Sequence, residues 1–209
     1  MTFSEAVKCY RCLLCKRHLD ELENVKNLYK AYKASPTPAT LHDLSKACVI
    51  GPHQHRILRS SKSTTISVIE SHLLTILATK FTNFEDLRYS VNSIIGSIPQ
   101  VGPLTVYDVS LRIGHLFNTP IYPRKYLYLN SGAMEGAKIL LNGRKLSPTE
   151  ELTTFFSYPE ALAVTGIGDL QALPNNLIED FFCVMKDYLA PGPRGLIPDR
   201  DKTSTYLGM

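Results

Sequence analysis

The sequence predicts an all-α fold, and three observations support that prediction. Apolar residues recur at helical spacing over most of the chain, and proline and glycine interrupt the pattern between segments. Only one short stretch, 122–129, suits an extended strand. The 209 residues, of which 44% are hydrophobic, can bury a full core. We therefore expect a compact helical domain with at most one short extended segment.

In the first half of the chain, helices are expected over 4–34, 39–47, 63–80 and 84–95. Pro36 and Pro38 end the first of these, because proline cannot continue a helix. A loop is expected over 50–56. Asn83 is a typical N-cap for the last helix, and Glu85 suits the positive end of its dipole.

In the second half, helices are expected over 103–117, 131–141, 148–156 and 175–189. Asn130 or Ser131 caps the second of these. The last twenty residues are rich in proline, glycine and charge and predict a flexible tail. The predicted organisation is an N-terminal helix over 1–34, a helical domain over 39–189 and a tail over 190–209.

Charge and composition limit the partners and the compartment. Residues 1–145 contain 19 Lys and Arg against 10 Asp and Glu, whereas residues 146–209 contain 4 against 9. The basic excess suits a polyanion such as nucleic acid. We expect no membrane span and no secretory signal, and hence a cytoplasmic protein. Five cysteines do not suggest a disulfide framework in a chain of this size.

The segment 98–108 predicts a small anion-binding turn. Pro103 suits the first position of a helix, where its missing N–H is not needed. The amides that follow, with the Thr105 hydroxyl, form a cradle suited to phosphate. The residues expected to contact the nucleic-acid backbone are Gly102, Leu104, Thr105 and Arg112. Arg124 and Lys125 would widen the basic surface. The competing interpretation is a connector that sets the crossing angle of two helices.

This turn resembles the helix-hairpin-helix, which binds a nucleic-acid backbone without reading its bases. Several segments are similar to a set of bacterial proteins of unassigned activity: 51–57, 102–108 with 111–114, 128–133 with 136–137, and 178–183. These proteins are distantly similar to the helix-hairpin-helix DNA glycosylase superfamily. The resemblance covers roughly the middle and C-terminal two thirds of the chain. Gln100 stands where the hairpin signature has glycine, and Asn130 stands where those proteins have histidine.

The glycosylase resemblance does not extend to the catalytic positions. Leu104 occupies the position of the glycosylase lysine, and no aspartate occurs between Asp108 and Asp169, where the stabilising carboxylate would lie. The sequence therefore argues against glycosylase chemistry by that route. If the protein is an enzyme, it would be a lyase, another glycosylase or a nuclease. The polar site expected in that case is His53, His55, Arg56, Tyr107 and Asp108.

The sequence also raises the hypotheses of a metal site and of a protein interface. The zinc-binding residue types are Cys9, Cys12, Cys15, Cys48 and His53. Spacing by three drifts round a helix by about 60° per step, which disfavours convergence of the first three cysteines on one ion. We therefore expect no cofactor. The apolar stripe of the helix over 4–34 would suit an adaptor that binds a partner protein, although packing on the chain's own core is favoured.

Together these observations predict binding of nucleic acid, DNA in the first instance, through the backbone and without strong sequence preference.

Overall fold

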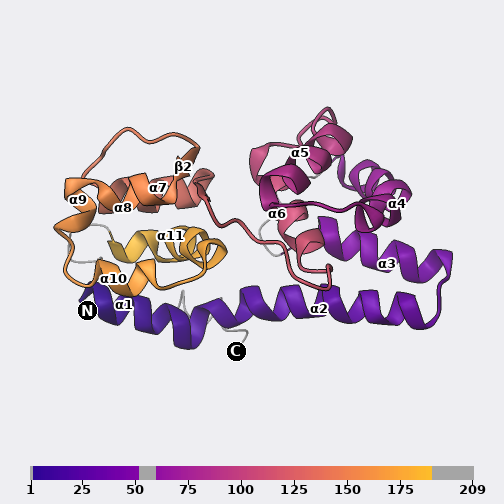
Figure 1. Ribbon diagram of the computed structural model, residues 1–209, viewed down its shortest axis with the longest axis horizontal. Coiled ribbons are helices and arrows are strands. Elements are labelled where there is room, and N and C mark those ends of the chain that lie inside the picture. The colour runs from indigo at the N-terminus through magenta and orange to yellow at the C-terminus, as the bar shows by residue number, and fades with distance from the viewer. Residues whose placement is uncertain (1, 52–59, 190–209) are drawn as a thin grey trace. The chain divides into compact units, whose positions relative to one another are not determined.

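The computed structural model describes residues 2–51 and 60–189, and their fold is all-α (Figure 1). The helix expected over 4–34 consists of α1 (Phe3–Cys9), one π-helical turn η1 (Tyr10–Leu14) and α2 (Cys15–Ala34). The tail expected over 190–209 lies outside the described residues.

The chain divides into two compact units, each with its own hydrophobic core. Unit 1 comprises residues 1–18 and 123–209, and unit 2 comprises residues 19–122. This division differs from the predicted domain over 39–189. The helical segment 1–34 is not an appendage, because Val7 and Tyr10 lie in the core of unit 1 and Val25 lies in the core of unit 2. Its apolar stripe is thus buried within the chain itself.

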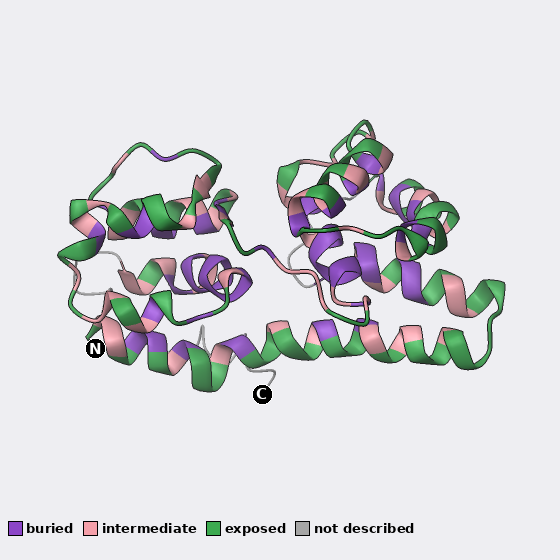
Figure 2. Ribbon diagram, viewed as in Figure 1, coloured by how far each residue is buried: buried purple, intermediate pink, exposed green. Residues whose placement is uncertain are grey.

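Unit 2 is built from helices. With the later part of α2 it contains α3 (Pro38–Val49), α4 (Lys62–Ala78), α5 (Phe84–Ile95) and α6 (Pro103–Gly114). The side chain of Thr37 caps α3, and that of Asn83 caps α5 as expected. Figure 2 shows α6 as largely buried. It ends at Gly114 rather than at 117, because the Ile121 amide returns to the Gly114 carbonyl at 2.9 Å.

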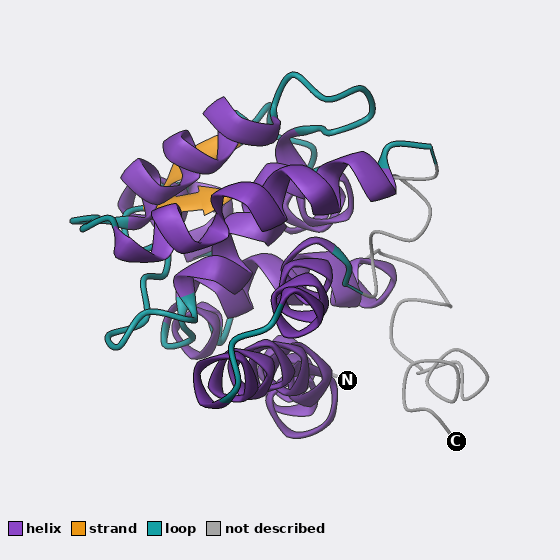
Figure 3. Ribbon diagram, turned by 90° about the vertical axis from the view of Figure 1, so that its right-hand side faces the viewer, coloured by secondary structure: helices purple, strands orange, loops and turns teal. Residues whose placement is uncertain are grey.

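Unit 1 combines helices with a small sheet. Its further elements are β1 (Tyr126–Tyr128), α7 (Ser131–Leu140), β2 (Thr149–Glu151), α8 (Leu152–Ser157), α9 (Pro159–Leu162), α10 (Ile167–Gln171) and α11 (Asn175–Leu189). The helix expected over 148–156 is wrong in its first part, because Thr149–Glu151 pairs antiparallel with β1 (Figure 3). The two strands exceed the single extended segment expected.

The π-helical turn places a tyrosine hydroxyl inside unit 1. Tyr10 is fully buried, and its hydroxyl donates a hydrogen bond of 2.7 Å to Asp180 on α11. Burial, reinforced by the charge of Asp180, raises the pKa of the Tyr10 hydroxyl far above its usual range. Tyr10 also packs edge-to-face on Phe181, with ring centroids 5.5 Å apart.

Glycines allow α7 and α11 to pack closely. A Cβ atom at Gly136 would lie 2.2 Å from the carbonyl oxygen of Phe182, and one at Gly132 would lie 2.9 Å from the Cys183 sulfur. The contact at Gly136 is with backbone, which cannot rotate away as a side chain can. The absence of a side chain at Gly136 therefore sets the approach of the two helices.

We expect Gly136→Ala to destabilise the protein by about 1–3 kcal/mol, because α7 and α11 would have to separate. Gly168→Ala is the matched control, since a Cβ there meets no described atom within 4 Å. Alanine is the better helix former, so the control should be neutral or slightly stabilising. Urea unfolding followed by circular dichroism measures both, and equal stabilities would contradict the packing argument.

Candidate functional site

The turn between α5 and α6 has the backbone geometry of a tight hairpin. Ile98 accepts a hydrogen bond of 3.1 Å from the Val101 amide, which closes a four-residue turn with Pro99 second and Gln100 third. Gln100 has φ 68°, in the left-handed region. Glycine is preferred there, and a residue with a side chain costs about 1 kcal/mol or more. Gln100 thus adopts the conformation that the glycine of the hairpin signature would favour.

The helix start that follows presents amides that have no intrahelical partner. Gly102 is the N-cap of α6, and its carbonyl accepts from the Val106 amide at 3.1 Å. The Leu104 and Thr105 amides precede the first intrahelical bond, and a glycine N-cap has no side chain to pair with them. The first turn contains no acidic residue, and a Cβ at Gly102 would meet no described atom within 4 Å. The start of α6 therefore suits an anion: the helix dipole is positive there, the amides can donate hydrogen bonds, and the surrounding space is open.

The Thr105 hydroxyl does not lie where a contact with phosphate was expected. The Thr105 side chain is buried, with 1% of the residue exposed, and its hydroxyl has no hydrogen-bond partner among the described residues. It does not lie at an exposed mouth of the turn.

Arg112 is not a surface cation, which corrects its expected role as a phosphate contact. Its side chain is 5% exposed and its Nε donates to a Glu21 carboxylate oxygen at 2.5 Å. Its Nη1 donates to the Cys48 carbonyl at 3.2 Å, near the end of α3. A Cβ at Gly51 would lie 1.9 Å from Nη2, so a side chain there would displace the guanidinium. Arg112 joins three segments of unit 2 instead of facing a ligand.

Of the polar site expected for an enzyme, only Tyr107 and Asp108 lie among the described residues. Tyr107 is 1% exposed and packs edge-to-face on Phe84, with centroids 5.7 Å apart. Asp108 is half-buried. The predicted loop residues His53, His55 and Arg56 lie outside the described residues.

Arg124 and Lys125 belong to unit 1, whereas the hairpin belongs to unit 2. Both are exposed, and Lys125 lies 3.9 Å from a Glu151 oxygen and 5.0 Å from the Tyr126 ring centroid. By composition, unit 2 has ten basic and eight acidic residues and unit 1 has thirteen and eleven. The charge asymmetry along the chain is therefore not a difference between the units.

The cysteines of the zinc hypothesis are distributed over both units. Cys9, Cys12 and Cys15 belong to unit 1, and Cys48 belongs to unit 2. Cys48 is fully buried, and burial raises the pKa of its thiol to about 12. Within 2–51 and 60–189, no three His, Cys, Asp or Glu side chains are grouped to hold a metal ion. The fifth residue of the set, His53, lies outside these ranges.

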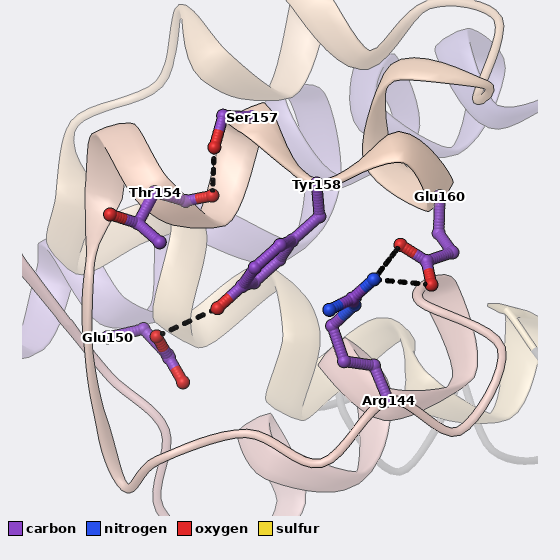
Figure 4. Close-up of polar contacts among 6 residues, drawn as sticks. All are labelled: Arg144, Glu150, Thr154, Ser157, Tyr158 and Glu160. Atoms are coloured by element: carbon purple, nitrogen blue, oxygen red, sulfur yellow. Dashed lines mark hydrogen bonds and ion pairs between the residues drawn. The ribbon is translucent and has the colours of Figure 1, made fainter.

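A polar cluster in unit 1 has no counterpart among the predicted sites (Figure 4). Arg144 donates to both oxygens of Glu160 at 2.8 Å, and its guanidinium carbon lies 4.3 Å from the Tyr158 ring centroid. The Tyr158 hydroxyl donates to Glu150 at 3.3 Å. Hydrogen bonding to Arg144 lowers the pKa of the Glu160 carboxyl. These groups satisfy one another, so the cluster joins the segment after α7 to β2 and α9 (Figure 4).

No local sequence pattern identifies this cluster, because Arg144 and Glu160 are 16 residues apart and meet only through the path of the chain.

Comparison with known proteins identified no matching family model, no matching curated protein and no matching solved structure. Among the described helices, none combines the length and apolar character needed to cross a membrane.

We expect Arg112→Met to destabilise the protein by about 3 kcal/mol or more, because it leaves the Glu21 carboxylate and the α3 carbonyls without their donor. The sign of Glu21→Gln then depends on the background. In the natural chain it removes one charge of the pair and destabilises, whereas in the Arg112→Met background it removes an unpaired charge and restores stability. Urea unfolding of the four proteins measures this coupling, and an equal effect of Glu21→Gln in both backgrounds would contradict it.

We expect Cys48 to resist alkylation in the folded protein. With a pKa of about 12, only on the order of 1 in 10,000 of its thiols is ionised at pH 8, and the thiolate is the reacting form. Exposed Cys12 should react first and Cys48 only in denaturant. Iodoacetamide labelling with peptide mass spectrometry checks the order, and equal labelling of the two in native protein would show that Cys48 is accessible.

Proposed function

We propose that the α5–α6 hairpin binds the phosphate backbone of nucleic acid, DNA in the first instance, without reading base sequence. The proposal rests on the geometry at the start of α6. Gly102 opens the helix without a side-chain cap, and the Leu104 and Thr105 amides are available at its positive end. Backbone amides contact phosphate oxygens and carry no base information.

The left-handed backbone of Gln100 supports the resemblance to a helix-hairpin-helix. That resemblance rests on the turn, and the fold of unit 2 is compatible with it because α5 and α6 pack against each other. The two helices thus hold the turn on a rigid base, as a preorganised backbone contact requires.

The charge of the hairpin's unit limits the strength of binding. Unit 2 has an excess of only two basic residues by composition, and Arg112 is occupied by Glu21. Few phosphates can therefore be neutralised, and non-specific affinity of about 10–100 μM at physiological salt is expected. The dependence on salt should be shallow, with a slope of log K on log salt of about −1 to −2.

The proposal assigns binding and no catalytic step. The positions of the glycosylase lysine and aspartate remain unfilled, and of the expected polar site only Tyr107 and Asp108 are described.

Gly102→Asp should weaken binding at least tenfold while leaving the fold intact. The φ of −103° and ψ of 178° suit an aspartate N-cap, whose carboxylate would accept from the amides that otherwise hold phosphate. We expect at least a tenfold loss of affinity for a fluorescent oligonucleotide at low salt, measured by anisotropy, with an unchanged or raised melting temperature.

Gly168→Asp is the matched control, because it adds the same charge at a glycine with equally open surroundings in unit 1. Its affinity should stay close to that of the natural chain. Undetectable binding of the natural chain to single-stranded and duplex DNA at low salt would exclude the proposed function. Equal binding by the Gly102→Asp variant would move the contact away from the hairpin.

A further inference from the structure

The start of α4 lies against the hairpin. The backbone amide of Ser60 donates a hydrogen bond of 3.4 Å to the side-chain oxygen of Gln100, the left-handed residue of the turn. Ser60 precedes the N-cap of α4, and Gln100 lies two residues before the N-cap of α6. This hydrogen bond therefore connects the starts of two helices that are far apart in the sequence.

Each of these two helix starts has a buried hydroxyl without a hydrogen-bond partner in the described part of the chain. Ser61 is the N-cap of α4, yet its side chain makes no capping bond, and the residue is 6% exposed. Thr105, in the first turn of α6, is 1% exposed. Buried polar groups are rarely left unpaired, and such exceptions call for an explanation.

The start of α4 is also suited to an anion by charge. The helix spans 17 residues, begins with Lys62 and has no acidic residue in its first turn. Within the described residues the Ser61 side chain does not cap this end, where the helix dipole presents positive charge.

We propose that the N-terminus of α4, at Ser61 and Lys62, is a second phosphate contact beside the hairpin. The site then takes two neighbouring phosphates of one nucleic-acid strand, one at each helix start. This inference rests on the proposed function, because it extends the contact at Gly102 to the next phosphate of the same backbone. The Ser61 hydroxyl donates to the second phosphate, and Lys62 balances its charge.

Gln100 is the positioning residue of this two-phosphate site. A glycine would relieve the left-handed backbone at this position, but it could not accept the hydrogen bond from Ser60. Gln100, which stands where the hairpin signature has glycine, thus strains the local backbone but links the starts of α4 and α6. Removing the Gln100 side chain should therefore raise the stability of the protein and lower its affinity for nucleic acid.

The experiment measures oligonucleotide binding by fluorescence anisotropy over a series of salt concentrations, together with melting temperature. The natural chain should give a slope of log K on log salt near two phosphate contacts, each worth about 0.7 for a single strand and about 0.9 for duplex. Gln100→Gly should raise the melting temperature, lower affinity several-fold and reduce the slope by about one contact.

Two variants at Ser61 test the second contact directly. Ser61→Asp places a carboxylate at the start of α4, where it would repel a phosphate, and should reduce the slope by about one contact. The melting temperature checks that this variant stays folded. Ser61→Ala removes only the hydroxyl, which has no partner among the described residues, and should weaken binding a few-fold. Thr37→Asp is the matched control, because it adds the same charge at the N-cap of α3 in the same unit and should leave binding unchanged.

The outcomes separate the two proposals. If Gly102→Asp weakens binding at least tenfold while Gln100→Gly, Ser61→Asp and Ser61→Ala keep the natural slope and affinity, the second contact is refuted and the proposed function stands. If the natural chain binds no oligonucleotide at low salt, both are refuted. A loss of binding in Thr37→Asp equal to that in Ser61→Asp would show a general charge effect and would also overturn the second contact.

Discussion

The organisation of unit 2 depends on the buried ion pair between Arg112 and Glu21. The Arg112 guanidinium also donates to carbonyls at the end of α3, because the last carbonyls of a helix have no intrahelical donors. One side chain thereby connects α2, α3 and α6, and the absence of a side chain at Gly51 leaves room for it. A cation can be buried in this way only because its charge and its donors are compensated. The hairpin lies at the opposite end of α6 from this contact.

The two ends of α6 consequently have different surroundings. Most of the helix after Thr105 is buried and contributes to the core, whereas its start at Gly102 faces open space among the described residues. A rigid helix with an uncapped start can present amides to an anion without reorganising. The modest charge of unit 2 means that such a contact relies on the backbone and the helix dipole more than on basic side chains.

Unit 1 is held together by a different set of contacts from those in unit 2. The buried Tyr10 hydroxyl is paired with Asp180, and glycines bring α7 against α11. The π-helical turn adds a residue to the helix next to this pair, a feature that often accompanies functional positions. The Arg144 cluster then ties the β2–α9 region together. None of these contacts joins neighbours in sequence, so each depends on the completed fold.

The sequence by itself determined the all-α class, the ends of most helices and the turn at 98–103. These features depend on periodicity, proline and capping residues, which act over a few neighbouring positions. Only the structure showed that Gln100 adopts a left-handed backbone, with φ 68°. Only the tertiary structure decided that Arg112 is buried, that Arg124 and Lys125 lie in the other unit, and that Thr149–Glu151 is a strand. Burial, ion pairing and strand pairing are set by residues far away in the chain. A local pattern that shows a cation near a turn cannot show whether a distant carboxylate already occupies it.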